Sequence, residues 1–378
     1  MERNYTHLGS YSDWVSEAHR QTNLYPMAEP GVSTRQKLLD ALGFNRVEEQ
    51  PLEIRRDFQW EKDGLAGEAI SWWVGYGPRT QAWLLRPAGH AEPLPGILAL
   101  HDHGGFKFYG KEKIADGPLA PDAALTVHRE SAYGGRAFAN EFARQGFAVL
   151  VHDAFLWGSR RFPLEDIPLQ DRMHGLRLVE AWKQEGREID DIAAYNAATG
   201  FHEHTIEKYC NLLGTTLAGV VSHEDRMALN YLASREDVIA DRLGCVGLSG
   251  GGNRSALLLA TSERIKAAVI VGLMSTYPGL LDHNVICHTW MFFPSGWARH
   301  GDWPDIAASR APMPLLVQYD REDDLFTLEG MQAAHERIIS HYQRSDSPQA
   351  YTGQFYPGPH KFDLEMQSEA YNWLLKNL

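Results

Sequence analysis

The sequence predicts an α/β fold in which helices cover both faces of a mostly parallel central sheet. Through most of the chain, short apolar runs alternate with longer amphipathic runs, an order typical of right-handed strand–helix–strand crossovers. The length of 378 residues and the hydrophobic content of 44% suffice for a large core. A Gly-rich turn also joins a strand-like run to a helix-like run within residues 245–260.

Residues 1–65 are expected to form an N-terminal extension that packs on the main body, residues 66–378. The extension is polar and aromatic, and its one helical candidate reads STRQKLLDALGF. Ser33 or Thr34 is placed to cap the start of this helix, and Gly43 is placed to end it.

The main body begins with a predicted antiparallel hairpin at residues 68–89, where two β-rich runs surround a Gly-Pro turn. Later strand-like runs lie at 96–105, 147–153, 242–250, 265–273, 313–320 and 350–358. Helix-like runs lie at 134–146, 216–235, 253–263, 327–342 and 363–378. Two long stretches, about 154–215 and 274–311, show no clear periodicity. We expect them to be lid-like insertions, because loops of that length are uncommon unless they are functional.

Charge and composition restrict the partners of the chain. Its 49 acidic and 36 basic residues give a formal charge of −13, which would repel a phosphate backbone and argues against nucleic acid. No run approaches about 18 uninterrupted apolar residues, and the first residues lack the pattern of a secretory signal. We therefore expect a cytoplasmic protein with no membrane partner. Cys210, Cys245 and Cys287 are too few and too scattered for a disulfide framework or a zinc site.

The turn GLSGG, residues 247–251, predicts an exposed nucleophile. A serine at the tip of a tight strand-to-helix turn has strained backbone angles and leaves no room for neighbouring Cβ atoms. Gly247, Gly250 and Gly251 supply that room around Ser249. A Gly-rich turn that cradles a phosphate is the alternative, but the G-x-G-x-x-G spacing is absent and the turn follows about the fifth strand rather than the first.

A serine nucleophile needs a histidine to take its proton and a carboxylate to orient that histidine. The strand-like run PLLVQYD leads into a cluster of acids, and His360 follows the last strand-like run, so the chain order is serine, acid, histidine. Asp320 ends the strand, where it would close the turn. Asp323, three residues later, is therefore the favoured acid, with Asp324 and Asp320 as alternatives. A solvated acidic turn is the structural alternative for the whole cluster.

The stretch LHDHGG predicts an oxyanion hole. Acyl transfer needs two or more N–H donors where the carbonyl oxygen becomes negative. We expect one donor to be the N–H of Gly250, after the candidate nucleophile. The other is an N–H of His103 or Gly104 in the LHDHGG stretch, called the early loop below. A metal site that uses His101 and His103 is less favoured, because no histidine pair has the helical H-E-x-x-H spacing. We expect no catalytic metal and no cofactor.

Four stretches together, LHDHGG, VGLSGGGNRSALLLA, YDREDDLF and FYPGPHKFD, resemble the α/β-hydrolase superfamily over about residues 66–378. Within it, the chain is similar to the dienelactone hydrolase and acetyl xylan esterase-like branch. The resemblance implies that Ser249 is the nucleophile, Asp323 the orienting acid and His360 the general base. Dienelactone hydrolases proper are shorter and use a cysteine nucleophile. The serine of this chain therefore favours an esterase over a lactone hydrolase.

The expected activity is that of a serine carboxylesterase acting on short-chain acyl esters, including acetylated carbohydrates. An aromatic segment at 283–305 contains Trp290, Trp297 and Trp303, whose ring faces suit sugars or apolar acyl groups; core packing is the alternative for these rings. A prolyl-oligopeptidase-like peptidase would use the same triad, and a non-catalytic binding protein could share the fold. The expected partner is a small-molecule ester, and a homo-oligomer is left open.

Overall fold

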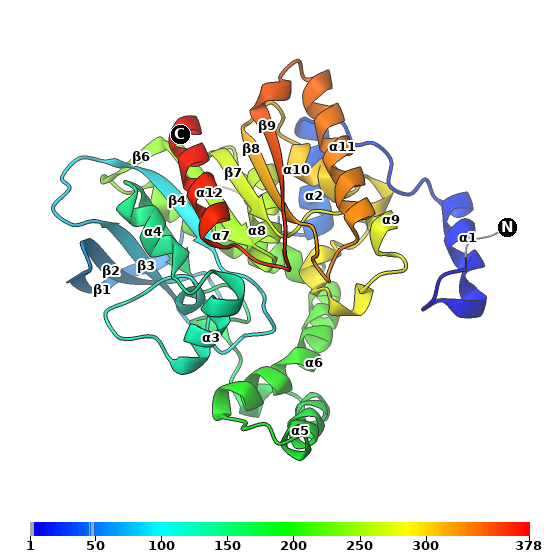
Figure 1. Cartoon of the computed structure of the whole chain (residues 1–378), viewed down its shortest axis with the longest axis horizontal. Coiled ribbons are helices and arrows are strands. Elements are labelled where there is room, and N and C mark those ends of the chain that lie inside the picture. Colours follow the sequence, from blue (N-terminus) through cyan, green and yellow to red (C-terminus); the bar gives the residue numbers. More distant parts are fainter. Residues whose placement is uncertain (1–3, 45, 47–48) are drawn as a thin grey trace.

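The computed structural model describes residues 4–44, 46 and 49–378. Its centre is a nine-stranded sheet (Figure 1). The strands are β1 Leu52–Lys62, β2 Leu65–Trp73, β3 Thr80–Pro87, β4 Leu94–Leu100, β5 Ala148–His152, β6 Val238–Leu248, β7 Ile265–Val271, β8 Leu315–Asp320 and β9 Tyr351–Tyr356. Their order in the sheet is β1-β2-β3-β5-β4-β6-β7-β8-β9.

The sheet is mostly parallel, as predicted. Strands β5, β4, β6, β7, β8 and β9 run parallel to one another. The predicted hairpin is formed by β2 and β3, and it continues the sheet in antiparallel pairing through β3 and β5. The carboxyl ends of the parallel strands therefore share one edge, where ligands of such sheets bind.

Strand β1 begins within the segment that the sequence predicted as an extension. It pairs with β2 in the antiparallel sense, so the sheet starts at Leu52 rather than near residue 66. The first eight residues of β1 are all exposed, and Arg55 and Arg56 lie among them. Its apolar residues Leu52, Ile54, Phe58 and Trp60 follow a period of two that the polar run of residues 55–57 interrupts. The sequence analysis did not assign this weak pattern to a strand.

Helices cover both faces of the sheet. One face is covered by α4 Phe138–Arg144 and α12 Leu364–Asn377, and the other by α2 Val32–Leu42, α7 Leu217–Ala233, α8 Gly250–Thr261, α10 Trp303–Ala308 and α11 Leu328–Arg344. Successive residues of β4 show the division, because Ile97 packs into one core and Leu98 into the other. The central strands are buried on both faces, and this makes them near-continuous apolar runs.

Helix α2 corresponds to the predicted N-terminal helix, but it is not capped as predicted. Its N-cap is Gly31, without a side-chain cap, and Thr34 instead donates to the carbonyl of Glu29. Gly43 ends the helix in the left-handed conformation with φ 79°, as expected. A further helix, α1 Asp13–Gln21, buries none of its residues and stands apart from the main body (Figure 1).

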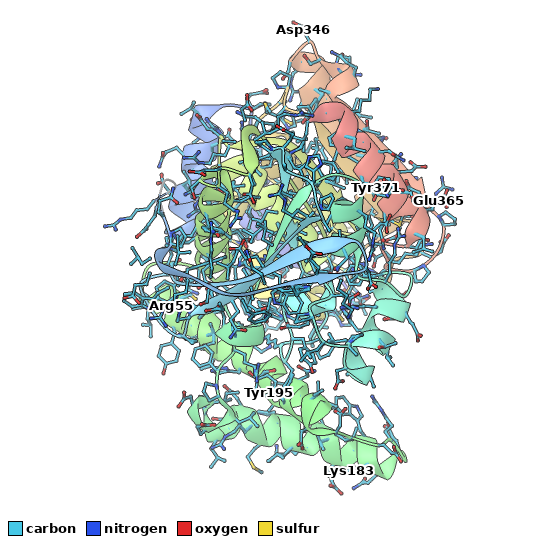
Figure 2. The ribbon with its side chains drawn as sticks, turned by 90° about the vertical axis from the view of Figure 1, so that its left-hand side faces the viewer. Arg55, Lys183, Tyr195, Asp346, Glu365 and Tyr371 are labelled. Carbon is cyan, nitrogen blue, oxygen red and sulfur yellow. The ribbon has the colours of Figure 1, made fainter. Side chains whose placement is uncertain are left out.

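The two predicted lid-like stretches contain regular structure. Helices α5 Leu169–Gln184 and α6 Asp191–Leu212 pack on each other, and α5 projects from the body with Lys183 near its far end (Figures 1 and 2). Residues 274–311 hold α9 Tyr277–Leu280 and α10. Leu169, Met173, Leu176 and Val179 recur at helical spacing in α5, a pattern that the sequence analysis did not use, although most of α5 is exposed.

The remaining elements are short. They are α3 Ala123–Ala132 and the 3-10 turns Gly9–Tyr11, Lys111–Lys113, Gly158–Arg160, Leu164–Asp166, Val285–Cys287, Trp290–Phe292, Trp297–Arg299 and Pro348–Ala350. Within the described ranges, no helix combines the length and the apolar character that crossing a bilayer would need.

Candidate active site

Ser249 lies at the turn between β6 and α8, with φ 59° and ψ −120°. Positive φ is unfavourable for a residue with a Cβ atom, so the surrounding structure must hold this turn in place. A Cβ on Gly247 would lie 2.6 Å from the Leu100 carbonyl oxygen, and a Cβ on Gly251 would collide with the same oxygen. The glycines therefore let the turn pack directly on the end of β4 while Ser249 remains partly exposed.

His360 and Asp323 are in direct contact. Asp323 follows β8 and His360 follows β9, and the His360 Nδ1 lies 2.6 Å from Asp323 Oδ2. The other carboxylate oxygen of Asp323 accepts from the backbone N–H of Leu325 at 2.8 Å. The Asp323 side chain is fully buried, whereas the His360 side chain is 25% exposed. With Nδ1–H donating to Asp323, the free lone pair of His360 is on Nε2.

The environment of His360 favours its protonated form. Burial by itself lowers the pKa of His360, but the hydrogen bond to Asp323 and the negative charges of Asp323, Asp320 and Asp102 outweigh burial and raise the pKa above its ordinary value. A carboxylate that orients a histidine and stabilises its imidazolium form is the arrangement that supports a general base.

The other two acids of the cluster have different surroundings. Asp324 is exposed, and its backbone carbonyl accepts from His283. Asp320 is buried beside the pair and accepts from the backbone N–H of Lys361 at 3.1 Å. Burial raises the pKa of Asp320 to about 7. Of the three candidate acids, Asp323 is therefore the one that contacts the histidine.

A cavity of about 230 Å³ brings the predicted residues together at the carboxyl edge of the sheet. It is lined by Ser249, His360, His103, Gly104 and Gly250. Its apolar lining includes Leu248, Leu273, Phe292, Leu325 and Phe326. Segments far apart in the sequence thus meet around one small, largely apolar space.

Buried donors hold the early loop by its carbonyl oxygens. Arg254 of α8 donates to the carbonyl of His101 at 3.1 Å. Lys113 donates to the carbonyls of Asp102 and His103, and the Trp157 indole donates to the His103 carbonyl at 3.3 Å. Among the described residues, no acceptor is bonded to the N–H groups of His103 and Gly104, nor to that of Gly250 in the first turn of α8. These N–H groups are available to an anion in the cavity.

Glu203 of α6 connects the helical hairpin α5–α6 to the early loop. The sequence analysis did not identify this residue. Its buried carboxylate accepts from His103 Nε2 and from Lys107 Nζ, each at 2.8 Å, and from Thr289 Oγ1 at 2.7 Å. Burial alone raises the pKa of Glu203, but Lys107 and His103 together hold it well below its usual range. His103 and Glu203 are a hundred residues apart, so no local sequence pattern could have linked them.

The prediction that tryptophans of residues 283–305 bind substrate needs correction. Trp297 and Trp303 are fully buried, and their indole N–H groups donate to the backbone carbonyls of Asp302 and Phe292. Trp290 is 37% exposed, but it bonds to His204 and does not line the cavity. The hydrophobic core, rather than a ligand, accounts for Trp297 and Trp303.

The two histidines of the early loop do not form a pair of metal ligands. His101 Nδ1 lies 3.0 Å from the Asp102 carbonyl, and both ring nitrogens of His103 are engaged, one by Glu203 and one by the N–H of Gly105. Within the described part of the chain, the side chains that lie close enough to share a cation are Asp320, Asp323 and His360. The hydrogen bond between His360 and Asp323 already accounts for the position of two of these three side chains.

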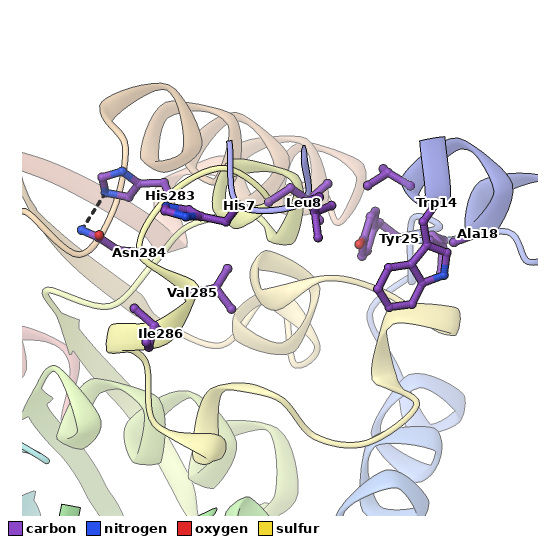
Figure 3. Close-up of a pocket in the computed structure, with 12 residues that line it drawn as sticks. His7, Leu8, Trp14, Ala18, Tyr25, His283, Asn284, Val285 and Ile286 are labelled. Atoms are coloured by element: carbon purple, nitrogen blue, oxygen red, sulfur yellow. Dashed lines mark hydrogen bonds between the residues drawn. The ribbon is translucent and has the colours of Figure 1, made fainter. Parts of the chain in front are cut away.

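A larger apolar cavity lies away from these residues. Figure 3 shows this space of about 630 Å³ between α1, which contributes Trp14 and Ala18, and the segment with Val285 and Ile286. Neither Ser249 nor His360 lines it.

Comparison with known proteins gives relatives at low identity. No protein-family model matches the chain. It is 25% identical over 280 residues to the Bacillus subtilis protein "Putative hydrolase YtaP", covering 72% of this chain and 75% of that protein. This similarity spans most of both chains.

Solved structures share the fold. A "putative acetyl xylan esterase" from Bacteroides fragilis superimposes with a TM-score of 0.65 at 16% identity, covering 92% of this chain and 82% of that one. A glucuronoyl esterase from Solibacter usitatus superimposes with a TM-score of 0.60 at 14% identity, covering 91% of this chain and 92% of that one. Acetyl xylan esterase 1 from a Thermoanaerobacterium species superimposes with a TM-score of 0.57 at 14% identity, covering 95% of this chain and 98% of that one. The chain therefore has the α/β-hydrolase fold, and its structural neighbours are acetyl xylan esterases and glucuronoyl esterases.

Proposed function

We propose that the protein is a serine carboxylesterase that hydrolyses short-chain acyl esters, including acetylated carbohydrates. One observation carries the proposal. Ser249, on a strained turn, lines the same small cavity as His360, and His360 is hydrogen-bonded to Asp323 at 2.6 Å. A hydroxyl, an oriented imidazole and a buried carboxylate form the set of groups that activates a serine.

In the first half of the reaction, Ser249 Oγ attacks the ester carbonyl carbon while His360 Nε2 takes the hydroxyl proton. Asp323 accepts the Nδ1–H bond and stabilises the resulting imidazolium. The negative oxygen of the tetrahedral intermediate is stabilised by the N–H of Gly250 and by that of His103 or Gly104. The bond between the carbonyl carbon and the alcohol oxygen then breaks, and His360 returns the proton to the departing alcohol.

In the second half, water replaces the alcohol. His360 takes a proton from water as the water oxygen attacks the acyl-enzyme carbonyl. When the bond to Ser249 Oγ breaks, the proton goes from His360 to that oxygen. The carboxylic acid leaves and the free enzyme is restored.

The dimensions and lining of the cavity favour short acyl groups. Its volume of about 230 Å³ lies below the usual range for drug-sized ligands, roughly 300–1,000 Å³. Apolar side chains such as Leu273 and Phe326 form much of its lining, which suits a small hydrocarbon group. The names of the structural neighbours, acetyl xylan esterase and glucuronoyl esterase, support an ester of a carbohydrate as the substrate class.

A panel of p-nitrophenyl acetate, butyrate and octanoate, together with aminoacyl arylamides, tests the proposal. We expect hydrolysis that is fastest for acetate or butyrate, and labelling of the native protein by a fluorophosphonate. Ser249→Ala is expected to abolish both, whereas Ser16→Ala, at an exposed serine of α1, leaves them unchanged. Faster cleavage of the arylamides would favour a peptidase. Absence of Ser249-dependent labelling and turnover would favour a binding protein.

A further inference from the structure

The cavity that holds Ser249 and His360 contains a second aspartate–histidine pair. His128 of α3 and Asp102 of the early loop both line it, and His128 Nε2 lies 3.2 Å from Asp102 Oδ1. Apart from the charge of Asp102, which contributes to the raised pKa of His360, the proposed ester hydrolysis assigns this pair no step. A polar group that faces a catalytic cavity without a part in the chemistry is a candidate for substrate recognition.

Asp102 is held rigidly as an ionised acceptor. Its carboxylate accepts from the Tyr133 hydroxyl at 2.6 Å and from Lys113 Nζ at 3.3 Å, and the side chain is 3% exposed. Burial alone raises the pKa of Asp102, but the charge of Lys113 and the bonds from His128 and Tyr133 together hold it well below its usual range. A carboxylate in this state only accepts hydrogen bonds.

The contact with Asp102 fixes the orientation of His128. In its neutral form the ring must carry its hydrogen on Nε2 to donate to Asp102, which leaves Nδ1 as an acceptor. The ring edge also packs on Phe106, at a centroid distance of 5.3 Å. Within the described residues nothing donates to Nδ1, and Nδ1 is not among the buried polar atoms that lack a partner. Nδ1 is therefore exposed to solvent on a side chain that lines the cavity and is 14% exposed.

The backbone leaves room for a ligand beside His128. A Cβ on Gly104 would lie 3.0 Å from the His128 ring and would collide with the Asp102 carboxylate, so only glycine allows the pair to pack against the loop. At Gly105, by contrast, an added Cβ would meet nothing within 4 Å. The space next to Gly105, which lines the same cavity as His128, is therefore open.

The two sides of the cavity suit the two parts of an ester. A short acyl group gains most from the apolar side, which includes Leu273, Phe292 and Phe326. The polar side, with His103 and His128, then receives the alcohol part, where an unpaired acceptor requires a donor.

We propose that His128, oriented by Asp102, accepts a hydrogen bond from a hydroxyl group on the alcohol part of the substrate, next to the ester bond. The protein is then selective for partially acylated polyols and sugars over esters of simple alkanols. This inference rests on the proposed esterase function and names the substrate class of that same site.

The test compares glycerol monoacetate, which has hydroxyls on the alcohol part, with propyl acetate, which has none. We expect the native protein to favour glycerol monoacetate in kcat/KM. His128→Phe keeps the ring but removes the acceptor, and should lower the ratio of the two kcat/KM values by about threefold to tenfold, the typical worth of one neutral hydrogen bond. His128→Gln can still donate to Asp102 and accept from substrate, so it should retain most of the ratio. His90→Phe, at an exposed turn histidine, is the matched control and should leave the ratio unchanged.

Ethyl lactate carries its hydroxyl on the acyl part. It therefore shows whether His128 recognises a hydroxyl on the alcohol part or one on the acyl part of the ester. A His128→Phe variant that loses activity selectively on ethyl lactate, or equally on all three esters, overturns the inference while Ser249-dependent hydrolysis leaves the esterase function standing. Should His128→Phe fail to fold, the native protein decides alone, because equal kcat/KM values for glycerol monoacetate and propyl acetate also overturn it. If no ester is hydrolysed in a Ser249-dependent manner, the proposed function fails and the inference fails with it.

Discussion

The backbone nitrogen of His103 lies directly against Gly250, so that a Cβ placed on Gly250 would be 2.6 Å from it. This contact joins the early loop after β4 to the first residue of α8. It brings two backbone N–H donors from distant parts of the chain to the cavity that contains Ser249. The spacing depends on the absence of a side chain at Gly250.

Gly250→Ala is expected to reduce kcat by about a hundredfold to a thousandfold, the loss typical for one oxyanion donor. The new methyl group must push the His103 backbone away from the turn, which separates the two N–H groups. Steady-state kinetics on p-nitrophenyl acetate measures the effect. Gly200→Ala is the control, because a Cβ there meets nothing within 4 Å. A Gly250→Ala variant with native kcat would remove these N–H groups from the mechanism.

Asp323→Asn is expected to lower kcat by about 10³ to 10⁴, because an amide no longer enforces Nδ1–H on His360 or stabilises the imidazolium. The side chain keeps its size, so the fold should persist and circular dichroism should match the native protein. Asp324→Asn, at the exposed neighbour, should retain native activity. If the Asp324 variant instead shows the large loss, the assignment of the acid is wrong.

The pH dependence of kcat/KM follows from His360. The base must be neutral, and the hydrogen bond and nearby carboxylates raise the pKa of His360 above its ordinary value despite burial. Activity should therefore fall on acidification through a pKa above about 6.5. The same protonation stabilises the fold, in full below the unfolded-state pKa, and this stabilisation is lost as the pH rises through the folded-state pKa. A profile of kcat/KM that stays flat to pH 4 would contradict a histidine base.

Asp320→Asn is expected to stabilise the protein more at pH 8 than at pH 5. Burial raises the pKa of Asp320 to about 7, so the native chain loses stability as the pH rises from the unfolded-state pKa through that value. Asparagine removes the titration. The change in unfolding free energy on substitution should differ between the two pH values by on the order of 2 kcal/mol. Chemical denaturation at both pH values measures it, and an equal change at both would place Asp320 in a more polar environment than its burial implies.

The sequence identified most of the fold because the central strands and the helices that cover them have strong patterns. Runs such as those of β4 and β7 are buried on both faces and are almost wholly apolar. The edge strand β1 and the helical hairpin α5–α6 were missed. Both have regularly spaced apolar residues, among them Leu52 and Ile54 in β1 and Leu169 and Met173 in α5, but these side chains are exposed. The patterns that predicted the fold were the stronger ones of segments buried in the core.

Some residues of the candidate site could be predicted from the sequence and others could not. Ser249, Asp323 and His360 could be chosen because each stands at a strand end in a recognisable turn and in a characteristic order. The buried support Glu203 contacts His103 across a hundred residues, a separation that one sequence does not reveal. Trp297 and Trp303 were misassigned because an aromatic residue in a predicted loop has the same pattern whether it faces a cavity or the core.

Substitution of Glu203 tests whether its contact with His103 of the early loop affects the proposed reaction. The N–H of Gly105 donates to His103 Nδ1 at 3.0 Å, so Nε2 must carry the hydrogen that is donated to Glu203. A glutamine at position 203 has one acceptor oxygen for the donors of His103, Lys107 and Thr289. Its NH₂ group would face one of these donors, and this conflict displaces the loop or the residues around Thr289.

We therefore expect Glu203→Gln to lower kcat at least tenfold with a smaller change in KM, because the substrate still binds while the oxyanion donors are misplaced. The unfolding free energy should fall by about 1–3 kcal/mol, the usual result of leaving a buried polar group unsatisfied. Glu180→Gln, at an exposed position of α5, should change neither quantity. A purely structural role predicts lower stability with native kcat at a temperature where the variant is folded. Kinetics and denaturation of the same preparation distinguish the two, because only displacement of His103 couples the loss of stability to a slower chemical step.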